Sequence, residues 1–101
     1  MQAALSNPQK RYLRGLAHDL KPIVMVGAKG VTAPLVAELD LALEQHELVK
    51  VKVAAEDRET RDAWIAELAE QSGAGLVSRI GHTAILYRRS KDKPLVILPR
   101  G

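Results

Sequence analysis

The segment that decides the fold is Val24-Met25-Val26-Gly27-Ala28-Lys29-Gly30-Val31-Thr32-Ala33-Pro34. A short apolar run of strand type stops at a G-x-x-G turn, and a helical pattern that Thr32 can cap begins directly after it. Glycine has no Cβ, so Gly27 and Gly30 allow a sharp turn and a close approach of backbone N–H groups to a ligand. Lys29 adds a positive charge, and the start of the helix adds the positive end of its dipole. The segment therefore predicts a strand–turn–helix unit that can seat a phosphate group.

The distribution of charge favours such an anion site over the plain alternative, a tight turn that happens to carry a surface lysine. The chain has 101 residues and a formal net charge of +3. Residues 1–35 carry five Lys or Arg against one acid, residues 36–72 carry four against ten, and residues 73–101 carry six against one. If the fold brings the two basic ends together, the molecule has one positive pole, which is typical of a protein that binds a polyanion.

The other sequence patterns complete a set of seven elements. The first helix begins at Ser6 or Asn7, and the third begins at Asp57 and ends at Gly73. Gly81-His82 joins the last two strands as a two-residue hairpin. In chain order we expect a helix from Ser6 or Asn7 to Leu20, a buried strand over 23–26, a helix from Thr32 to about Glu47, a strand over 48–54, a helix over 58–72, and strands over 76–80 and 83–89.

The periodicity of each element predicts which side chains are buried. In the second helix, Glu47 belongs to the outer, acidic face. In the strand over 48–54, alternate valines face the core, while Lys50 and Lys52 face polar surroundings. The first helix is expected to bury a stripe at helical spacing: Leu13, Leu16, Ala17 and Leu20.

This order of elements predicts a single α/β domain with three helices and a four-stranded mixed sheet. The helical crossover makes the first two strands parallel, and the final hairpin makes the sheet mixed. One domain is expected over residues 1–101, with its core over about 5–98, because a chain of 101 residues fits one domain. The proline-bracketed segment Pro94–Pro99 is expected to pack as an edge segment.

Several function classes lack the residues that they need. The chain has no cysteine, and none of His18, His46 and His82 has a second ligand at helical spacing, so we expect no metal site. Motifs for a nucleophile, a dinucleotide or a nucleotide phosphate are missing from the sequence, so we expect no enzyme and no cofactor. The sequence shows neither a secretory signal nor a membrane-spanning run, so we expect a cytoplasmic protein.

Basic side chains outside the turn are candidates for extending a polyanion site. Lys10 and Arg14 lie on one face of the first helix, and Lys21 lies just beyond its end. Arg88 and Arg89 end the last strand. Because a short connection leads from the helix into the strand that ends at the turn, we expect the helical stripe to border the glycine turn.

Aromatic residues are scarce, with one tryptophan, two tyrosines and no phenylalanine. Proteins that read single-stranded nucleic acid on a sheet stack its bases on exposed aromatic rings. This chain lacks the residues for such a platform. A nucleic acid would therefore be held by its backbone and shape, with weak base specificity.

Four segments carry a family resemblance: Leu16–Pro22, Gly27–Gly30, His46–Lys52 and Ile80–Arg89. They resemble the bacterial YhbY-type RNA-binding proteins, the stand-alone form of the CRM domain (chloroplast RNA splicing and ribosome maturation), and the resemblance extends from about Leu5 to Arg100. The family fold is similar to the C-terminal domain of bacterial translation initiation factor three, with a G-x-x-G loop like that of KH domains.

The resemblance implies a protein that binds structured RNA, expected to be ribosomal RNA of large-subunit precursors, in ribosome assembly. We expect the protein to be a monomer. The residues that it places in the RNA-binding loop are Gly27, Ala28, Lys29 and Gly30. Three alternatives remain open. One is a protein-interaction module that docks through its acidic helices or the apolar tail Leu95–Leu98, the second is a small regulator that binds a phosphorylated metabolite at the turn, and the third is a DNA-binding protein.

Overall fold

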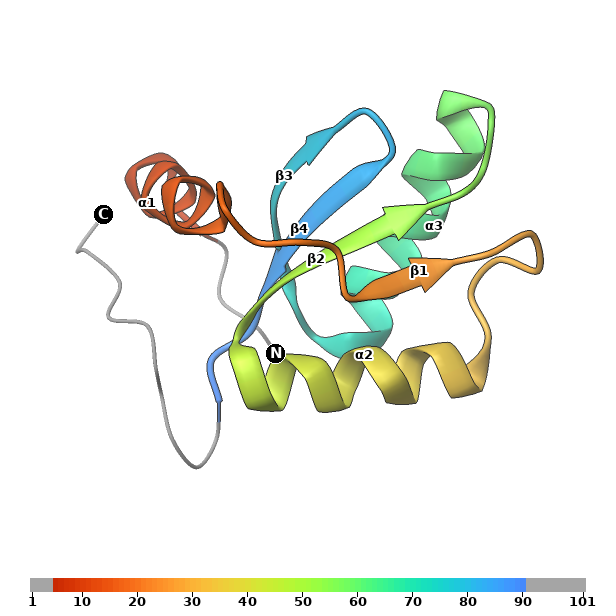
Figure 1. Cartoon of the computed structure of the whole chain (residues 1–101), viewed down its shortest axis with the longest axis horizontal. Helices are drawn as coiled ribbons and strands as arrows, with labels where there is room; N and C mark the ends of the chain where they lie inside the picture. The colour runs from red at the N-terminus through yellow and green to blue at the C-terminus, as the bar shows by residue number, and fades with distance from the viewer. Residues whose placement is uncertain (1–4, 91–101) are drawn as a thin grey trace.

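The computed structural model describes residues 5–90 and contains three helices and four strands (Figure 1). They are α1 (Asn7–Ala17), β1 (Val24–Val26), α2 (Ala33–His46), β2 (Leu48–Val53), α3 (Arg58–Ser72), β3 (Gly75–Ile80) and β4 (Thr83–Tyr87). The strand order in the sheet is β1-β2-β4-β3, with β1 parallel to β2 and the other pairs antiparallel. The predicted α/β domain with a four-stranded mixed sheet is confirmed. The predicted edge segment Pro94–Pro99 lies outside the described residues.

The helices begin where the capping residues predict. The side chains of Ser6, Thr32 and Asp57 each accept a hydrogen bond from the backbone N–H three residues later. The bond from Thr60 N–H also holds the pKa of the Asp57 carboxyl below its usual range. Gly73, with φ of 72°, ends α3 in the left-handed conformation that glycine adopts without strain.

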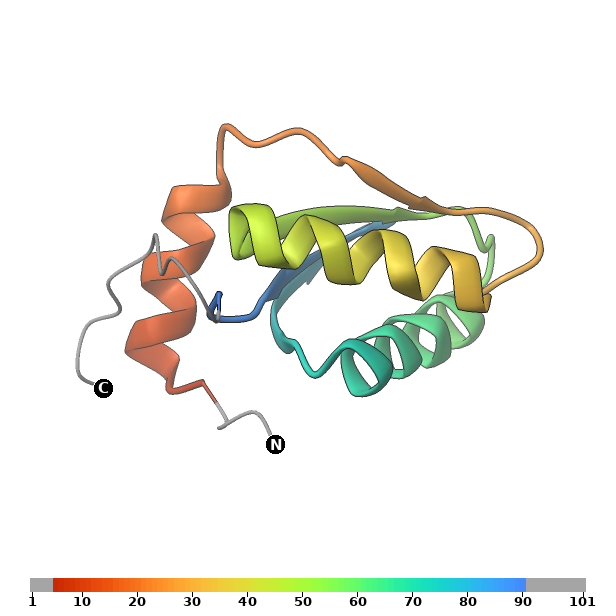
Figure 2. The same cartoon turned by 90° about the horizontal axis from the view of Figure 1, so that it is seen from below.

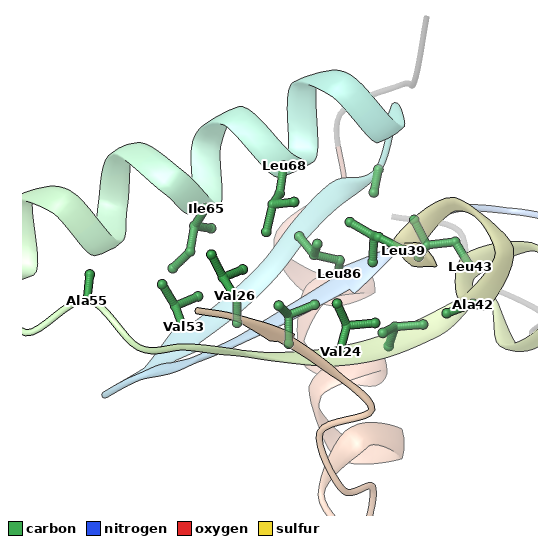
Figure 3. Packing of buried hydrophobic residues seen from close by; sticks show 14 residues of the cluster. Val24, Val26, Leu39, Ala42, Leu43, Val53, Ala55, Ile65, Leu68 and Leu86 are labelled. Atoms are coloured by element: carbon green, nitrogen blue, oxygen red, sulfur yellow. The ribbon is translucent and has the colours of Figure 1, made fainter. Parts of the chain in front are cut away.

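The main core lies between the sheet and the two long helices. Figure 2 shows α2 and α3 on the same side of the sheet, and Figure 3 shows their apolar side chains meeting those of the strands. On the helices, Leu39 and Leu43 come from α2, and Ile65 and Leu68 from α3. The alternating valines of β2, at 49, 51 and 53, belong to this core, as their period of two predicts.

The opposite face of the sheet carries α1 at one end only (Figure 1). Leu13 and Ala17 of α1 pack there against Leu48, Ile85 and Tyr87. The rest of this face has no helix over it within residues 5–90. Two helices therefore pack on one face of the sheet, and α1 alone packs on the other, which we call the half-covered face.

This half-covered face overturns two burial predictions. Leu16 and Leu20 were expected in the buried stripe of the first helix, but they are 44% and 40% exposed. The helix ends at Ala17 and not at Leu20, so Leu20 lies beyond it, and Leu16 is exposed because α1 crosses only the end of the sheet. The strand over 23–26 was expected to be buried. It begins at Val24, and Met25 is 59% exposed, since its side chain points to the uncovered face.

A third correction concerns Glu47, which was expected on the outer face of the second helix. Glu47 instead ends α2 with φ of 61° and is fully buried. Its backbone carbonyl accepts the N–H of Arg88 at 3.0 Å, and its carboxylate accepts the N–H of Ser90 at 2.6 Å. The residue therefore ties the chain after β4 to the corner between α2 and β2.

Arg88 completes this tie. Its guanidinium forms ion pairs with Asp40 and Glu44 of α2 and donates a hydrogen bond of 2.8 Å to the carbonyl of Ser72 at the end of α3. Only 14% of the Arg88 side chain is exposed. One side chain thus joins the C-terminal half of α2, the end of α3 and the chain directly after β4.

We expect Arg88→Met to lower the free energy of unfolding by about 2 kcal/mol. Breaking a buried ion pair costs ~3–5 kcal/mol, and the exposure of Asp40 reduces that figure here. The control is Arg89→Met, since Arg89 is exposed and its loss should change stability by less than ~0.5 kcal/mol. Urea unfolding of both variants measures the difference, and equal midpoints would contradict the role given to Arg88.

Candidate nucleic-acid interface

The glycine turn is a tight, exposed bend between β1 and α2. Gly30 N–H donates to the carbonyl of Gly27 at 3.0 Å, which closes a four-residue turn. Gly27, Ala28 and Lys29 are exposed, while Gly30 is buried with φ of 75°. A Cβ at Gly30 would lie 3.0 Å from the indole ring of Trp64. The turn therefore needs glycine at its last position and rests on α3.

The N-terminus of α2 is less available to a ligand than the sequence predicts. Thr32 Oγ1 already accepts the N–H of Leu35 at 3.3 Å, and Pro34 has no N–H to donate. Two of the first N–H groups of the helix are thereby satisfied or missing. The helix dipole still points its positive end toward the turn, but the donors for an anion must come from the turn itself.

The exposed residues of the turn supply those donors. Within residues 5–90, the N–H groups of Ala28 and Lys29 donate no hydrogen bond to the backbone. In the same range, the ammonium group of Lys29 takes part in no ion pair. Two backbone donors and one positive charge therefore stand together on an exposed bend, which is a suitable seat for a phosphate oxygen.

A row of side chains crosses the uncovered face of the sheet next to this turn. The strand register aligns Met25 with Lys52, Lys52 with Thr83, and Thr83 with Ile80. Aligned residues on neighbouring strands point to the same face. Met25, Lys52 and Ile80 are exposed, so the row offers one lysine between apolar side chains. Lys50, on the same face, donates to the carbonyl of His18 at 3.5 Å.

The basic stripe of α1 lies away from the turn. Figures 1 and 2 both place α1 at one end of the domain and the turn at the other. The expectation that the stripe borders the turn is therefore wrong, because the connection after α1 runs along the sheet before β1 begins. Lys10, Arg14 and Lys21 instead stand at the far end of the half-covered face, with Arg14 and Lys21 exposed.

The last two predicted basic residues differ from each other. Arg88 is occupied by Asp40, Glu44 and Ser72, so its charge is neutralised inside the protein. Arg89 is exposed next to it. Of this pair, only Arg89 presents a charge on the surface.

An apolar groove separates α1 from the start of β2. Its volume is about 380 Å³, and it is lined by exposed leucines of α1 and the connection that follows it, together with residues from the corner between α2 and β2. The lining residues are Leu16, Leu20, Lys21, Ile23, His46, Leu48, Val49 and Lys50. The incomplete burial of α1 thus leaves apolar surface beside a basic one.

Other kinds of site find no support in the part of the chain that the structure describes. Residues 5–90 contain no group of three or more His, Cys, Asp or Glu side chains arranged to hold a metal ion. Among the same residues, no helix combines the length and the apolar composition that a membrane span requires.

Comparisons with known proteins match this chain to proteins that are named as RNA-binding proteins. The CRS1/YhbY (CRM) domain model matches residues 5–88. A Haemophilus influenzae protein named RNA-binding protein is 47% identical over 96 residues, covering 95% of this chain and 96% of that protein. A Bacillus subtilis protein named probable RNA-binding protein YqeI is 39% identical over 95 residues, covering 94% of this chain and 99% of that protein. These relatives are named as RNA-binding proteins and not as enzymes.

A solved structure shows the same fold. The solution structure of a hypothetical Staphylococcus aureus protein, for which RNA binding has been suggested, matches with a TM-score of 0.83 and 36% sequence identity. The match covers 94% of this chain and 99% of that one. With its glycine turn, its sheet order and these relatives, the chain belongs to the CRS1/YhbY (CRM) domain family.

Proposed function

We propose that this protein binds structured RNA by the sugar–phosphate backbone, with the turn Gly27–Gly30 as its central contact. The exposed N–H groups of Ala28 and Lys29, beside the Lys29 ammonium, carry the proposal. An anion held there gains two backbone hydrogen bonds and one charge interaction. The names of the relatives support RNA as the polyanion.

Basic side chains elsewhere on the half-covered face extend the contact with the RNA. Lys52 stands in the row between the turn and α1, and Lys10, Arg14 and Lys21 stand at the α1 end. Cations at both ends of one face suit two segments of a folded RNA better than one short strand. Tyr87 is buried and Trp64 is partly buried against the core. Among residues 5–90, Tyr12 on α1, 43% exposed, is the one exposed aromatic ring, so base stacking contributes little to binding.

The proposal includes the biological target that the family resemblance implies, together with the location and monomeric state that we expect from the sequence. The RNA is ribosomal RNA of large-subunit precursors, and the protein acts as a monomeric assembly factor in the cytoplasm. Filter binding against transcribed ribosomal RNA domains, transfer RNA and a plain RNA duplex tests the target. We expect the tightest binding to one large-subunit domain, whereas equal affinity for all three would remove the ribosomal part of the proposal.

Salt dependence tests the contact at the turn. Each phosphate that a cation neutralises adds about one to the slope of log affinity against log salt. We expect Lys29→Gln to reduce that slope by about one and Lys29→Arg to preserve it. An unchanged slope for Lys29→Gln, measured by fluorescence anisotropy over a salt series, would show that Lys29 does not contact the backbone.

A protein-interaction module is the second candidate, because the groove between α1 and β2 exposes leucines beside a basic surface. The same protein would then dock on a ribosomal protein through Leu16 and Leu20. Association with large-subunit particles that survives nuclease treatment and is lost in Leu16→Asp/Leu20→Asp would support it. Loss of association after nuclease treatment alone would favour direct RNA binding.

A further inference from the structure

A second basic site lies where the tip of the β3–β4 hairpin meets the start of α3. A cavity of about 290 Å³ is lined there by three arginines and one glycine, Arg58, Arg61, Arg79 and Gly81. Among the described residues, no acidic side chain lines it. We refer to these four residues as the arginine pocket. The sequence did not indicate this pocket, because Arg58 and Arg61 lie in the segment 36–72, which carries ten acids against four cations.

Arg61 is held in place by the backbone and not by a carboxylate. Its Nη1 donates to the carbonyls of Ala55 at 3.1 Å and Glu56 at 2.5 Å, and lies 3.1 Å from Nε2 of His82. Within residues 5–90, Arg61 takes part in no ion pair, and its buried Nε has no hydrogen-bond partner. Its guanidinium is therefore oriented without a direct ion pair, and Asp57 interacts with it only electrostatically.

The other two arginines share one acid. Arg79 forms an ion pair with Asp62, and Arg58 Nε lies 3.9 Å from the same carboxylate. Arg58 is 76% exposed and Arg79 27% exposed. The carboxylate of Asp57 caps α3 and also interacts electrostatically with Arg61. Three guanidinium groups thus stand against two carboxylates, which leaves one positive charge for a ligand.

The arginine pocket is close to the glycine turn in the fold. Ala54 N–H donates to the carbonyl of Val26, the residue before Gly27, at 2.9 Å, and Val53 N–H donates to the carbonyl of His82 at 2.7 Å. The segment 53–56 is therefore bonded to the turn side on one hand and to the hairpin tip on the other. Figure 1 shows the end of β1, the hairpin tip and the start of α3 at the same end of the domain.

We propose that the arginine pocket binds a second phosphate of the RNA that the turn holds. Guanidinium groups suit this ligand, because their planar N–H donors match two oxygens of a phosphate at once. The inference rests on the proposed RNA-binding function and adds a contact on the other side of segment 53–56. One phosphate site on each side of that segment would fix the direction in which the RNA backbone leaves the turn.

Arg58→Gln and Asp62→Asn test the pocket with opposite signs. Arg58→Gln is expected to weaken binding to a structured ribosomal RNA fragment by about tenfold, the effect of one charge-assisted hydrogen bond, and to reduce the salt slope by about one. Asp62→Asn frees Arg58 and Arg79 from their carboxylate and is expected to strengthen binding. Because Asp62→Asn also raises the net charge by one, its gain is compared with that of Glu70→Gln, which makes the same change at an exposed position of α3. A larger gain for Asp62→Asn is not expected from a purely structural role.

The controls separate this inference from the proposed function. Arg58→Lys keeps the charge and should retain the salt slope, and thermal melting of each variant checks that the fold persists. If Lys29→Gln weakens binding while Arg58→Gln and Asp62→Asn leave it unchanged, the arginine pocket is overturned and the turn stands. If the arginine pocket variants act as expected and Lys29→Gln does not, RNA binding centres on α3 and the proposed role of the turn fails.

Discussion

A chain that carries Ala28→Asp and Lys29→Asp together is expected to lose RNA affinity by roughly a hundredfold or more, while its thermal unfolding stays nearly unchanged. Both side chains are exposed, and neither residue has the positive φ that would make a substitution strained. The two carboxylates would stand beside the N–H groups that we assign to a phosphate, and the local cation is lost as well. Filter binding with a ribosomal RNA fragment and a melting curve measure the two effects.

A matched control separates this local effect from the change in total charge. The double variant changes the formal net charge by three units from +3. Ala37→Asp, Gln45→Asp and Gln71→Asp together give the same net charge, and all three positions are exposed on α2 or α3. We expect this triple variant to keep most of its affinity. An equal loss in both variants would show that binding depends on total charge and not on the turn.

Local sequence rules predicted the helices and strands well because the interactions that start and pattern these elements lie between residues close together in the sequence. The capping side chains of Ser6, Thr32 and Asp57 each bond within their own first turn, so three neighbouring residues are enough to recognise them. The alternation of β2 likewise reports one buried face directly. What an element buries against depends on where distant segments lie. Leu16 and Met25 were misjudged for that reason, since α1 covers only half of its face.

The candidate site shows the same limit. The turn Gly27–Gly30 was recognisable because a phosphate seat of the proposed kind requires adjacent residues. Arg88 looked like a free cation, and its neutralisation by α2 depends on a contact across 48 residues. The arginine pocket needs Arg61 and His82, which are 21 positions apart and meet only when the hairpin tip reaches α3. No spacing rule along the chain predicts such pairs.

The second large effect is expected at Gly30, where alanine should lower the free energy of unfolding by about 2–5 kcal/mol. Left-handed backbone costs a residue with a Cβ ~1–2 kcal/mol, and forcing an atom into a packed site costs ~1–3 kcal/mol. Both terms apply, because Gly30 has φ of 75° and its Cβ would lie 3.0 Å from Trp64. Urea unfolding measures the loss.

Gly27→Ala is the control, because the two glycines occupy the same turn in different environments. A Cβ at Gly27 would meet no heavy atom within 4 Å, and Gly27 does not have a positive φ. Alanine there should leave stability within ~1 kcal/mol of the parent, and the lower entropy of its unfolded chain would favour a small gain. Equal losses at Gly27 and Gly30 would mean that the turn does not have the shape described.

A substitution at Trp64 separates the two costs of Gly30→Ala, that of the left-handed backbone and that of the steric contact with the indole ring. Trp64→Leu removes the indole ring that a Cβ at Gly30 would meet, so it should relieve the steric term and leave the backbone term. The loss from Gly30→Ala is therefore expected to fall to ~1–2 kcal/mol in the Trp64→Leu background. Full additivity in this double-mutant cycle would show that the ring does not support the turn. Non-additivity would mean that α3, which carries two arginines of the arginine pocket, also contacts the glycine turn through Trp64.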